Sequence, residues 1–88
     1  MSEYIYIIVH PNSIKKSREP NEWKELQRTK SKEKYFIVRG DPSEIPENLP
    51  RKKLIRLCGG LIGVCLADQL NSLRKQEYKA FLYYPACV

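Results

Sequence analysis

The chain has few side chains suited to nucleophilic chemistry: one histidine, His10, and three cysteines. His10 could activate the thiol of Cys87 if two strand ends meet, but no third group that would orient such a base is evident. Cys58 and Cys65 lie seven residues apart, which places both on one stripe of a helix and favours buried free thiols. We therefore expect no catalytic residues and a protein that is not an enzyme.

Motifs for metal and phosphate binding are also missing from the sequence. A structural zinc site takes about four ligands, and no Cys-x-x-Cys, His-x-His or carboxylate–histidine group supplies them. The glycines do not have the spacing of a Walker or Rossmann phosphate loop. The sequence therefore predicts no metal and no cofactor.

Charge is distributed unevenly along the chain, whose formal net charge is +6. Residues 13–39 carry nine basic and four acidic side chains, a net charge of +5. Residues 40–49 carry three acidic side chains and no basic one, whereas residues 50–56 carry four basic side chains and no acid. Such a surplus favours anionic partners, such as nucleic acid, phosphate groups or an acidic protein surface, and plain solubility is the alternative explanation.

The cysteine count and the uncharged runs bear on the compartment. Three cysteines, without a basic start or a small-residue cleavage site in residues 1–10, are typical of reduced thiols in the cytoplasm. The longest uncharged run in the second half, residues 57–67, has eleven residues, whereas a membrane-spanning helix needs about 20. We expect a cytoplasmic protein with no membrane partner, in which Cys87 is the exposed thiol.

Hydrophobic patterning divides the chain, which we expect to form a single domain over residues 1–88. Runs rich in Ile, Val, Tyr and Phe predict three strands, at residues 4–10, 35–39 and 80–86. Acids in a first turn favour a weakly specified helix over residues 22–30, with a mobile loop as the alternative. The prolines between the second strand and residue 50 predict an extended connector.

Residues 50–76 carry the strongest helical pattern, because apolar side chains recur there with the helical period. Gly59 and Gly60 oppose a helix, since each glycine costs roughly 1 kcal/mol relative to alanine. A rival interpretation places a hairpin turn at these glycines, between strands at residues 54–58 and 61–66. We favour one long helix, which gives an α/β (α+β) fold with a small sheet of about three strands packed on that helix.

Side chains alternate across a strand, and one division makes the three predicted strands agree. A mostly aliphatic set suits packing under the long helix and consists of Ile5, Ile7, Val9, Phe36, Val38, Ala80, Leu82 and Tyr84. The other set is aromatic and consists of Tyr4, Tyr6, Ile8, Tyr35, Ile37, Arg39, Phe81 and Tyr83. With one strong helix, we expect this aromatic face to stay open, unless residues 13–34 fold back over it with Trp23 as the plug.

An open aromatic face beside basic segments suits a protein interface, or the stacking of unpaired bases. The partner-binding residues that it predicts are Tyr4, Tyr6, Tyr35, Phe81, Tyr83 and Arg39. The basic residues that would hold an anion, with a solvated basic turn as the alternative, are Lys15, Lys16, Arg51, Lys52, Lys53 and Arg56.

Small residues recur every four positions on the other side of the predicted long helix, at Gly59, Gly63 and Ala67. Residues of this size and spacing let a second backbone approach closely. They predict a helix-packing surface, against either the weak helix or the same helix of a second copy, and an accidental cluster is the alternative. Pairing with a second copy would make a two-fold dimer.

These features favour binding without catalysis. We expect a small, basic, non-enzymatic protein that docks on a larger protein partner and regulates or inhibits it, either alone or as a homodimer. The alternative is a nucleic-acid-binding module that stacks single-stranded RNA or DNA on the aromatic face and holds phosphates with the basic residues.

Overall fold

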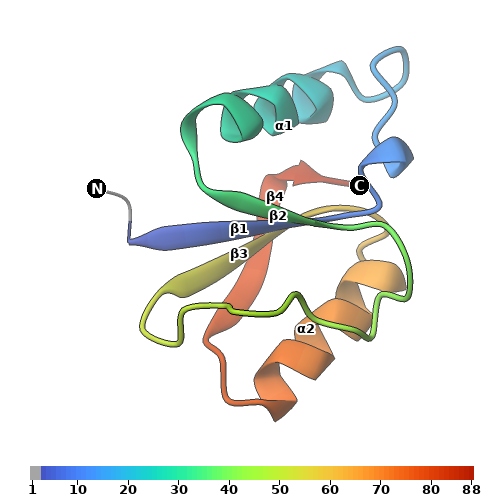
Figure 1. Ribbon diagram of the computed structural model, residues 1–88. Coiled ribbons are helices and arrows are strands. Elements are labelled where there is room, and N and C mark those ends of the chain that lie inside the picture. The colour runs from blue at the N-terminus through green and yellow to red at the C-terminus, as the bar shows by residue number, and fades with distance from the viewer. Residues whose placement is uncertain (1–2) are drawn as a thin grey trace.

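A four-stranded parallel sheet forms the centre of the part of the chain that the computed structural model describes, residues 3–88. Its strands are β1 (Tyr4–Val9), β2 (Tyr35–Val38), β3 (Leu54–Gly59) and β4 (Ala80–Cys87). They lie in the order β2-β1-β3-β4, and each neighbouring pair is parallel (Figure 1). The predicted mixed α/β class is confirmed, with one strand more than expected.

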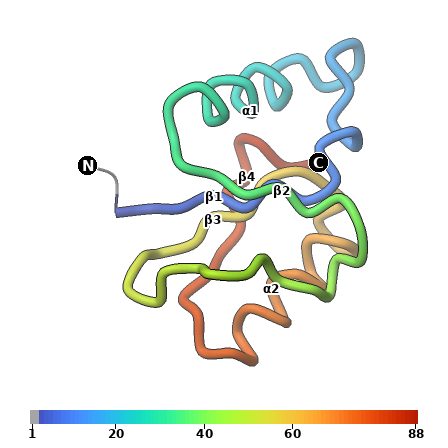
Figure 2. The backbone as a smooth tube through the Cα atoms, viewed as in Figure 1, coloured from blue at the N-terminus to red at the C-terminus, as the bar shows by residue number. Residues whose placement is uncertain are grey.

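Two α-helices in the described residues cover opposite faces of this sheet and make a three-layer molecule. The helix α1 (Pro20–Lys32) lies on one face, and α2 (Cys65–Lys75) lies on the other (Figures 1 and 2). A single 3₁₀ turn, η1 (Pro11–Ser13), follows β1. Because a helix separates β1 from β2 and β3 from β4, each pair can run parallel, which a tight hairpin would forbid.

The central position of β1 explains why its sequence does not alternate between apolar and polar residues. Ile7 and Val9 are buried in a core that includes the apolar side chains of α2, whereas Tyr6 and Ile8 are buried in a second core beneath α1. Parallel strands that are covered on both faces typically read as continuous apolar runs. The predicted division of side chains between two faces is therefore confirmed for this strand.

The single long helix predicted over residues 50–76 is wrong. Residues Leu54–Gly59 form β3, and α2 occupies only Cys65–Lys75. Within β3, Leu57 joins the core beneath α2 and Cys58 joins the core beneath α1. An apolar run of this kind fits a doubly covered strand as well as a helical stripe, so the periodicity alone could not separate the two structures.

The rival hairpin interpretation is correct for its first strand and wrong for its second. Residues 61–64 form a turn that leads into α2, so no strand follows Gly60 directly. In place of a hairpin partner, β3 has β1 on one side and β4 on the other, both parallel to it. The two glycines therefore mark the end of a central strand.

The helix predicted over residues 22–30 is confirmed, with the bounds Pro20–Lys32. A proline occupies its first turn, where the missing N–H breaks no helical hydrogen bond. Leu26 and Thr29 are fully buried against the sheet. Of the two arrangements considered for residues 13–34, the structure adopts the one in which they fold back over the aromatic face.

The proline-rich segment between β2 and β3 forms neither a helix nor a strand and lies on the α2 side of the sheet (Figure 1). Turns at residues 42–43, 47–48 and 51–52 interrupt the extended connector that the prolines predict. Gln69 of α2 is fully buried and donates its side-chain amide to the carbonyl oxygens of Pro42, at 2.8 Å, and Glu44, at 2.9 Å. Leu49 is buried in the core beneath α2. These contacts fix the path of the segment that leads from β2 to β3. The segment passes β1, because β1 lies between these two strands in the sheet.

Candidate functional site

The aromatic face of the sheet is covered by α1, so the prediction of an open face is wrong. Tyr6 is 3 % exposed, and Tyr4, Tyr35 and Tyr83 pack against the core beneath α1. Phe81 retains an exposed edge, but its ring meets that of Tyr4 edge to face, with 6.2 Å between the centroids. The five aromatic residues predicted to bind a partner therefore form no continuous open platform.

A polar network explains how α1 covers this face although few of its side chains are apolar. The hydroxyl of Tyr83 donates to Oε2 of Glu25 at 2.5 Å, and Arg28 forms an ion pair with the same carboxylate. The hydrogen bonds from Arg28 and Tyr83 hold the pKa of Glu25 below its ordinary value. The hydrogen bond that the Tyr83 hydroxyl donates to Glu25 raises the pKa of Tyr83. The network therefore ties α1 to β4.

Arg56 points from β3 into the same layer, among three tyrosine rings. Its guanidinium carbon lies 3.6 Å from the ring centroid of Tyr4 and 5.2 Å from that of Tyr83. Nη1 of Arg56 also donates to the hydroxyl of Tyr6 at 2.9 Å. Cation–π contacts of this kind stabilise a partly buried guanidinium. The helix predicted over residues 50–76 includes Arg56 near its start, whereas the structure places Arg56 on a strand that faces the aromatic layer.

The other basic residues predicted to hold an anion are divided between the two ends of the sheet. Lys15 and Lys16 follow β1 and η1, near the carboxyl edge of the strands. Arg51, Lys52 and Lys53 precede β3, at the amino edge. Because the strands are parallel, these two edges lie at opposite ends of the molecule. The structure does not bring these basic residues together, and residues 51–53 precede a strand in place of the expected helix.

The predicted helix-packing surface is also wrong, because its three residues do not share a helix. Gly59 ends β3, Gly63 lies in the turn after it, and only Ala67 belongs to α2. Gly59 has a different role, since its φ is +106° and a Cβ there would lie 1.9 Å from the carbonyl oxygen of Val9. A residue without a side chain is required where β3 closes on β1.

The His10–Cys87 pair is not formed. Nε2 of His10 lies 2.8 Å from the carbonyl oxygen of Gly40, beyond the end of β2. The thiol of Cys87 donates to the carbonyl oxygen of Leu57 at 3.2 Å. Cys87 is 5 % exposed, contrary to expectation, because β4 continues to this residue, and burial raises the pKa of its thiol to about 11.

A concave surface lies at the carboxyl edge of the sheet. A hollow of about 220 Å³, which we name the Arg39 hollow, is lined by His10, Pro11, Asn12 and Arg39. In open α/β sheets, ligands bind outside the carboxyl ends of the strands, where successive connections leave on opposite faces. The chain meets this condition at β1, since β2 lies on one side of β1 and β3 on the other, with α1 and α2 on opposite faces.

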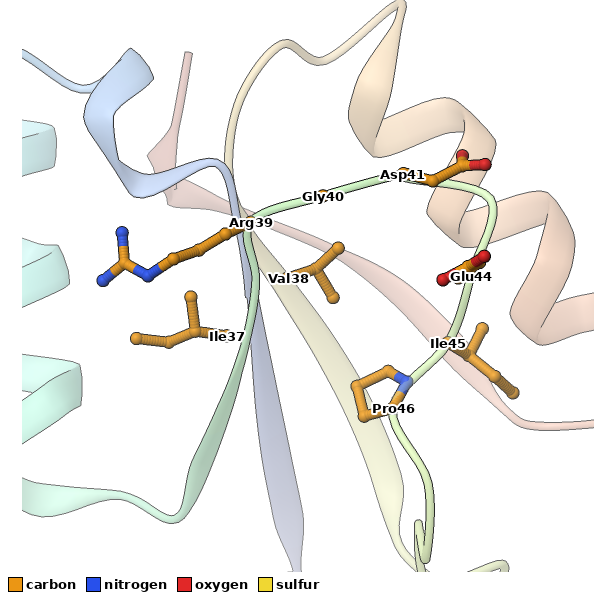
Figure 3. A pocket seen from close by; sticks show the side chains of 8 residues that line it. All are labelled: Ile37, Val38, Arg39, Gly40, Asp41, Glu44, Ile45 and Pro46. Carbon is orange, nitrogen blue, oxygen red and sulfur yellow. The ribbon is translucent and has the colours of Figure 1, made fainter.

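A second hollow of about 220 Å³, the connector hollow, lies on the other side of the end of β2 (Figure 3). Its lining residues are Ile37, Val38, Arg39, Gly40, Asp41, Glu44, Ile45 and Pro46. The side chain of Arg39 points toward α1, away from Asp41 and Glu44 (Figure 3). Hydrogen bonds from the backbone and hydroxyl of Ser43 lower the pKa of Asp41. Arg39 therefore lines both hollows, and only the connector hollow also has carboxylates in its lining.

Exposed apolar side chains stand at the same edge, in the turn from β3 to α2. Leu61 is 50 % exposed and Val64 is 56 % exposed. Gly60 donates its N–H to the carbonyl oxygen of Val9 at 3.0 Å, so this turn begins beside His10. The sequence reasoning missed this surface because it placed the turn inside a helix; the signal that could have found it was the pair of glycines at the end of an apolar run.

These features define a three-layer α/β protein with a parallel sheet and a concave carboxyl edge. No family model, curated protein or solved structure matches the chain. Within residues 3–88, no helix has both the length and the apolar character needed to cross a bilayer. No three histidine, cysteine or carboxylate side chains of that same segment gather as metal ligands would. The carboxyl edge, with its hollows and its exposed apolar turn, is the candidate binding surface.

Proposed function

We propose that the protein is a small, basic, non-enzymatic binding protein that docks on a larger protein partner through the carboxyl edge of its sheet. The observation that carries this proposal is the exposure of Leu61 and Val64 at the same edge of the sheet as the Arg39 hollow. Exposed apolar side chains that gather in one place, rather than singly, mark contact surfaces. Interfaces are also enriched in arginine, and Arg39 lies at this same edge, after the end of β2.

The charge of this edge supports an acidic partner. The chain has a formal net charge of +6, and the exposed side chains of Lys15 and Lys16 follow η1 near the same edge as Arg39. Basic surfaces of this kind steer the approach of acidic ones and exclude basic ones. We infer a partner whose apolar patch is rimmed by carboxylates, and docking that regulates or inhibits that partner.

Nucleic-acid binding, the alternative from the sequence, has less support. Stacking of single strands needs accessible rings, and Tyr6 and Tyr35 pack into the core beneath α1. The basic residues that would hold phosphates are divided between opposite edges of the sheet. Homodimerisation is compatible with the proposal, because a second copy could be the partner that covers Leu61 and Val64.

The setting that we propose is the cytoplasm. Cys58, Cys65 and Cys87 are all free thiols. An odd number of unpaired cysteines is typical of proteins kept in a reducing compartment. The protein partner would accordingly be cytoplasmic as well.

Affinity capture with matched variants tests the proposal. The wild-type protein, a Leu61→Ser/Val64→Ser double variant and a Tyr84→Ser control are each immobilised and exposed to a nuclease-treated cell extract. Tyr84 is 64 % exposed and lies on β4, outside the turn. We expect the wild-type and control proteins to retain the same partner and the double variant to lose it. Equal melting temperatures would show that all three are folded.

Two results would contradict the proposal. One is a set of captured proteins that the double variant retains unchanged. The other is capture that occurs only without nuclease, which would favour nucleic acid. Light scattering on the purified wild-type protein then separates the possible partners, because a dimer that the Leu61→Ser/Val64→Ser variant abolishes would identify the partner as a second copy.

A further inference from the structure

We propose that the Arg39 hollow binds a small oxyanion, the carboxylate or phosphate group of a small-molecule ligand. This inference goes beyond docking on a protein and does not depend on it. The lining brings one guanidinium, one imidazole and one carboxamide around a hollow of about 220 Å³. A guanidinium presents paired N–H donors whose planar geometry matches two oxygens of a carboxylate or phosphate.

Arg39 is the cation that makes the hollow an anion site. Its side chain is exposed, and no hydrogen bond or ion pair within the described residues engages its guanidinium. Two other arginines differ in this respect. Arg28 forms an ion pair within α1, and Arg56 lies among tyrosine rings. Asp41 and Glu44, which follow it in the chain, point to the other side of the end of β2 (Figure 3). The donors of Arg39 are therefore available to a ligand.

His10 also lines the hollow, and backbone hydrogen bonds fix its position. Its φ of 46° and ψ of 65° are left-handed, a conformation that non-glycine residues adopt rarely and that collects at ligand clamps. Its N–H donates to the carbonyl oxygen of Val38, and its own carbonyl oxygen accepts from the N–H of Ser13, each at 2.9 Å. The imidazole then reaches across to the carbonyl oxygen of Gly40. His10 is thus a positioning residue that spans β1 and β2.

The size of the hollow sets the class of ligand. Pockets that enclose a drug-sized molecule begin at about 300 Å³, and this hollow has about 220 Å³. It holds one charged group, while the rest of the ligand extends over the carboxyl edge. Its place at the point where the chain reverses direction across the sheet is the place where α/β sheets bind such groups. A terminal phosphate or carboxylate on a small metabolite fits both observations.

Titration of the isolated full chain, followed by amide chemical shifts in NMR spectra, tests this proposal. Inorganic phosphate and succinate are added separately at low ionic strength, up to millimolar concentrations. We expect saturable shifts at the amides of His10, Asn12, Arg39 and Gly40. Arg39→Gln should weaken binding by about tenfold or more, because it removes a charge-assisted hydrogen bond. Saturation by one probe alone tells which oxyanion the hollow prefers.

A control variant with the same change of charge distinguishes a specific anion site from general electrostatic attraction to a basic protein. Lys75→Gln removes one exposed cation at the end of α2, at the amino edge of the sheet, and should leave binding unchanged. A second variant, Asn12→Ala, should weaken binding less than Arg39→Gln while keeping the wild-type spectrum. The proposal is overturned if neither probe gives saturable shifts, or if Arg39→Gln and Lys75→Gln weaken binding equally. Neither result would bear on the capture experiment at Leu61 and Val64.

Discussion

The hydroxyl of Tyr83 lies 2.5 Å from Oε2 of Glu25 and joins β4 to α1 across 58 positions of the chain. Arg28 holds the same carboxylate through an ion pair and also donates to the Tyr83 hydroxyl at 3.3 Å. Few side chains of α1 are fully buried, Leu26 and Thr29 among them. The polar anchor therefore adds to the burial of Leu26 and Thr29 in keeping α1 over the aromatic face.

Tyr83→Phe should lower the free energy of unfolding by about 1 kcal/mol, the usual contribution of a half-exposed hydrogen bond. The substitution removes the hydroxyl and keeps the ring, which meets the ring of Tyr6 edge to face. Urea denaturation measures the change. Tyr84→Phe is the matched control, because that side chain is largely exposed, and it should change nothing. Equal effects of the two substitutions would show that the anchor does not contribute to stability.

Glu25 should make stability depend on pH in the acid range. Hydrogen bonds from Arg28 and Tyr83 hold its folded-state pKa below the ordinary value of 4.5. Between these two pKa values the unfolded chain binds more protons, so stability rises with pH there. The contribution of the carboxylate is complete above the ordinary value and is lost as the pH falls through the folded-state pKa.

Glu25→Gln tests this dependence, because the amide does not titrate. Unfolding free energies from urea denaturation should differ most between wild type and variant near neutral pH. The difference should shrink as the pH falls below the ordinary value of 4.5 and the wild-type carboxylate takes up its proton. A difference that stays constant over this range would mean that the carboxylate has an ordinary pKa in the folded protein.

The faces of the strands could be predicted from the sequence because side-chain alternation is a local property. Ile7 and Tyr6 were assigned to opposite faces, and they lie in opposite cores. What covers the second face is not local. It depends on contacts between residues far apart in the chain, such as the hydrogen bond between Tyr83 and Glu25, which no local sequence pattern indicates.

The candidate site could not be predicted because it depends on strand order. Arg39 was chosen as a member of the aromatic face, yet its position in the site comes from the pairing of β2 beside β1. Leu61 and Val64 were placed in a helix, since the run before them satisfies both helical and strand patterns. The pairing of β3 with β1 on one side and β4 on the other decides between a helix and a strand. Both partner strands lie far from β3 in the sequence.

Gly59→Ala should destabilise the protein by about 3 kcal/mol or more, at the upper end of single substitutions. A Cβ at this position would lie 1.9 Å from the carbonyl oxygen of Val9, and the φ of +106° is unfavourable for alanine. The measurement is urea denaturation. Gly63→Ala is the control, because a Cβ there meets nothing within 4 Å, and it should be nearly neutral. Similar losses at both positions would contradict the close approach of β3 to β1.

Cys65 should be the one thiol that reacts rapidly with a disulfide reagent in the native protein. It is half-buried at the start of α2, whereas Cys58 and Cys87 are buried. Burial raises the pKa of Cys87 to about 11 and that of Cys58 further. At mildly alkaline pH these two thiols are therefore protonated as well as inaccessible, and a thiol attacks only as the thiolate.

The stoichiometry and rate of thiol modification test this order of reactivity. The native wild-type protein should release one equivalent of chromophore in a fast phase and three equivalents after unfolding in guanidinium. Cys65→Ser should abolish the fast phase, because the remaining thiols become accessible only when the structure opens. Cys58→Ser is the control and should retain it. If a fast phase remains in Cys65→Ser, the reactive thiol is Cys58 or Cys87. That result would contradict the burial of these two thiols.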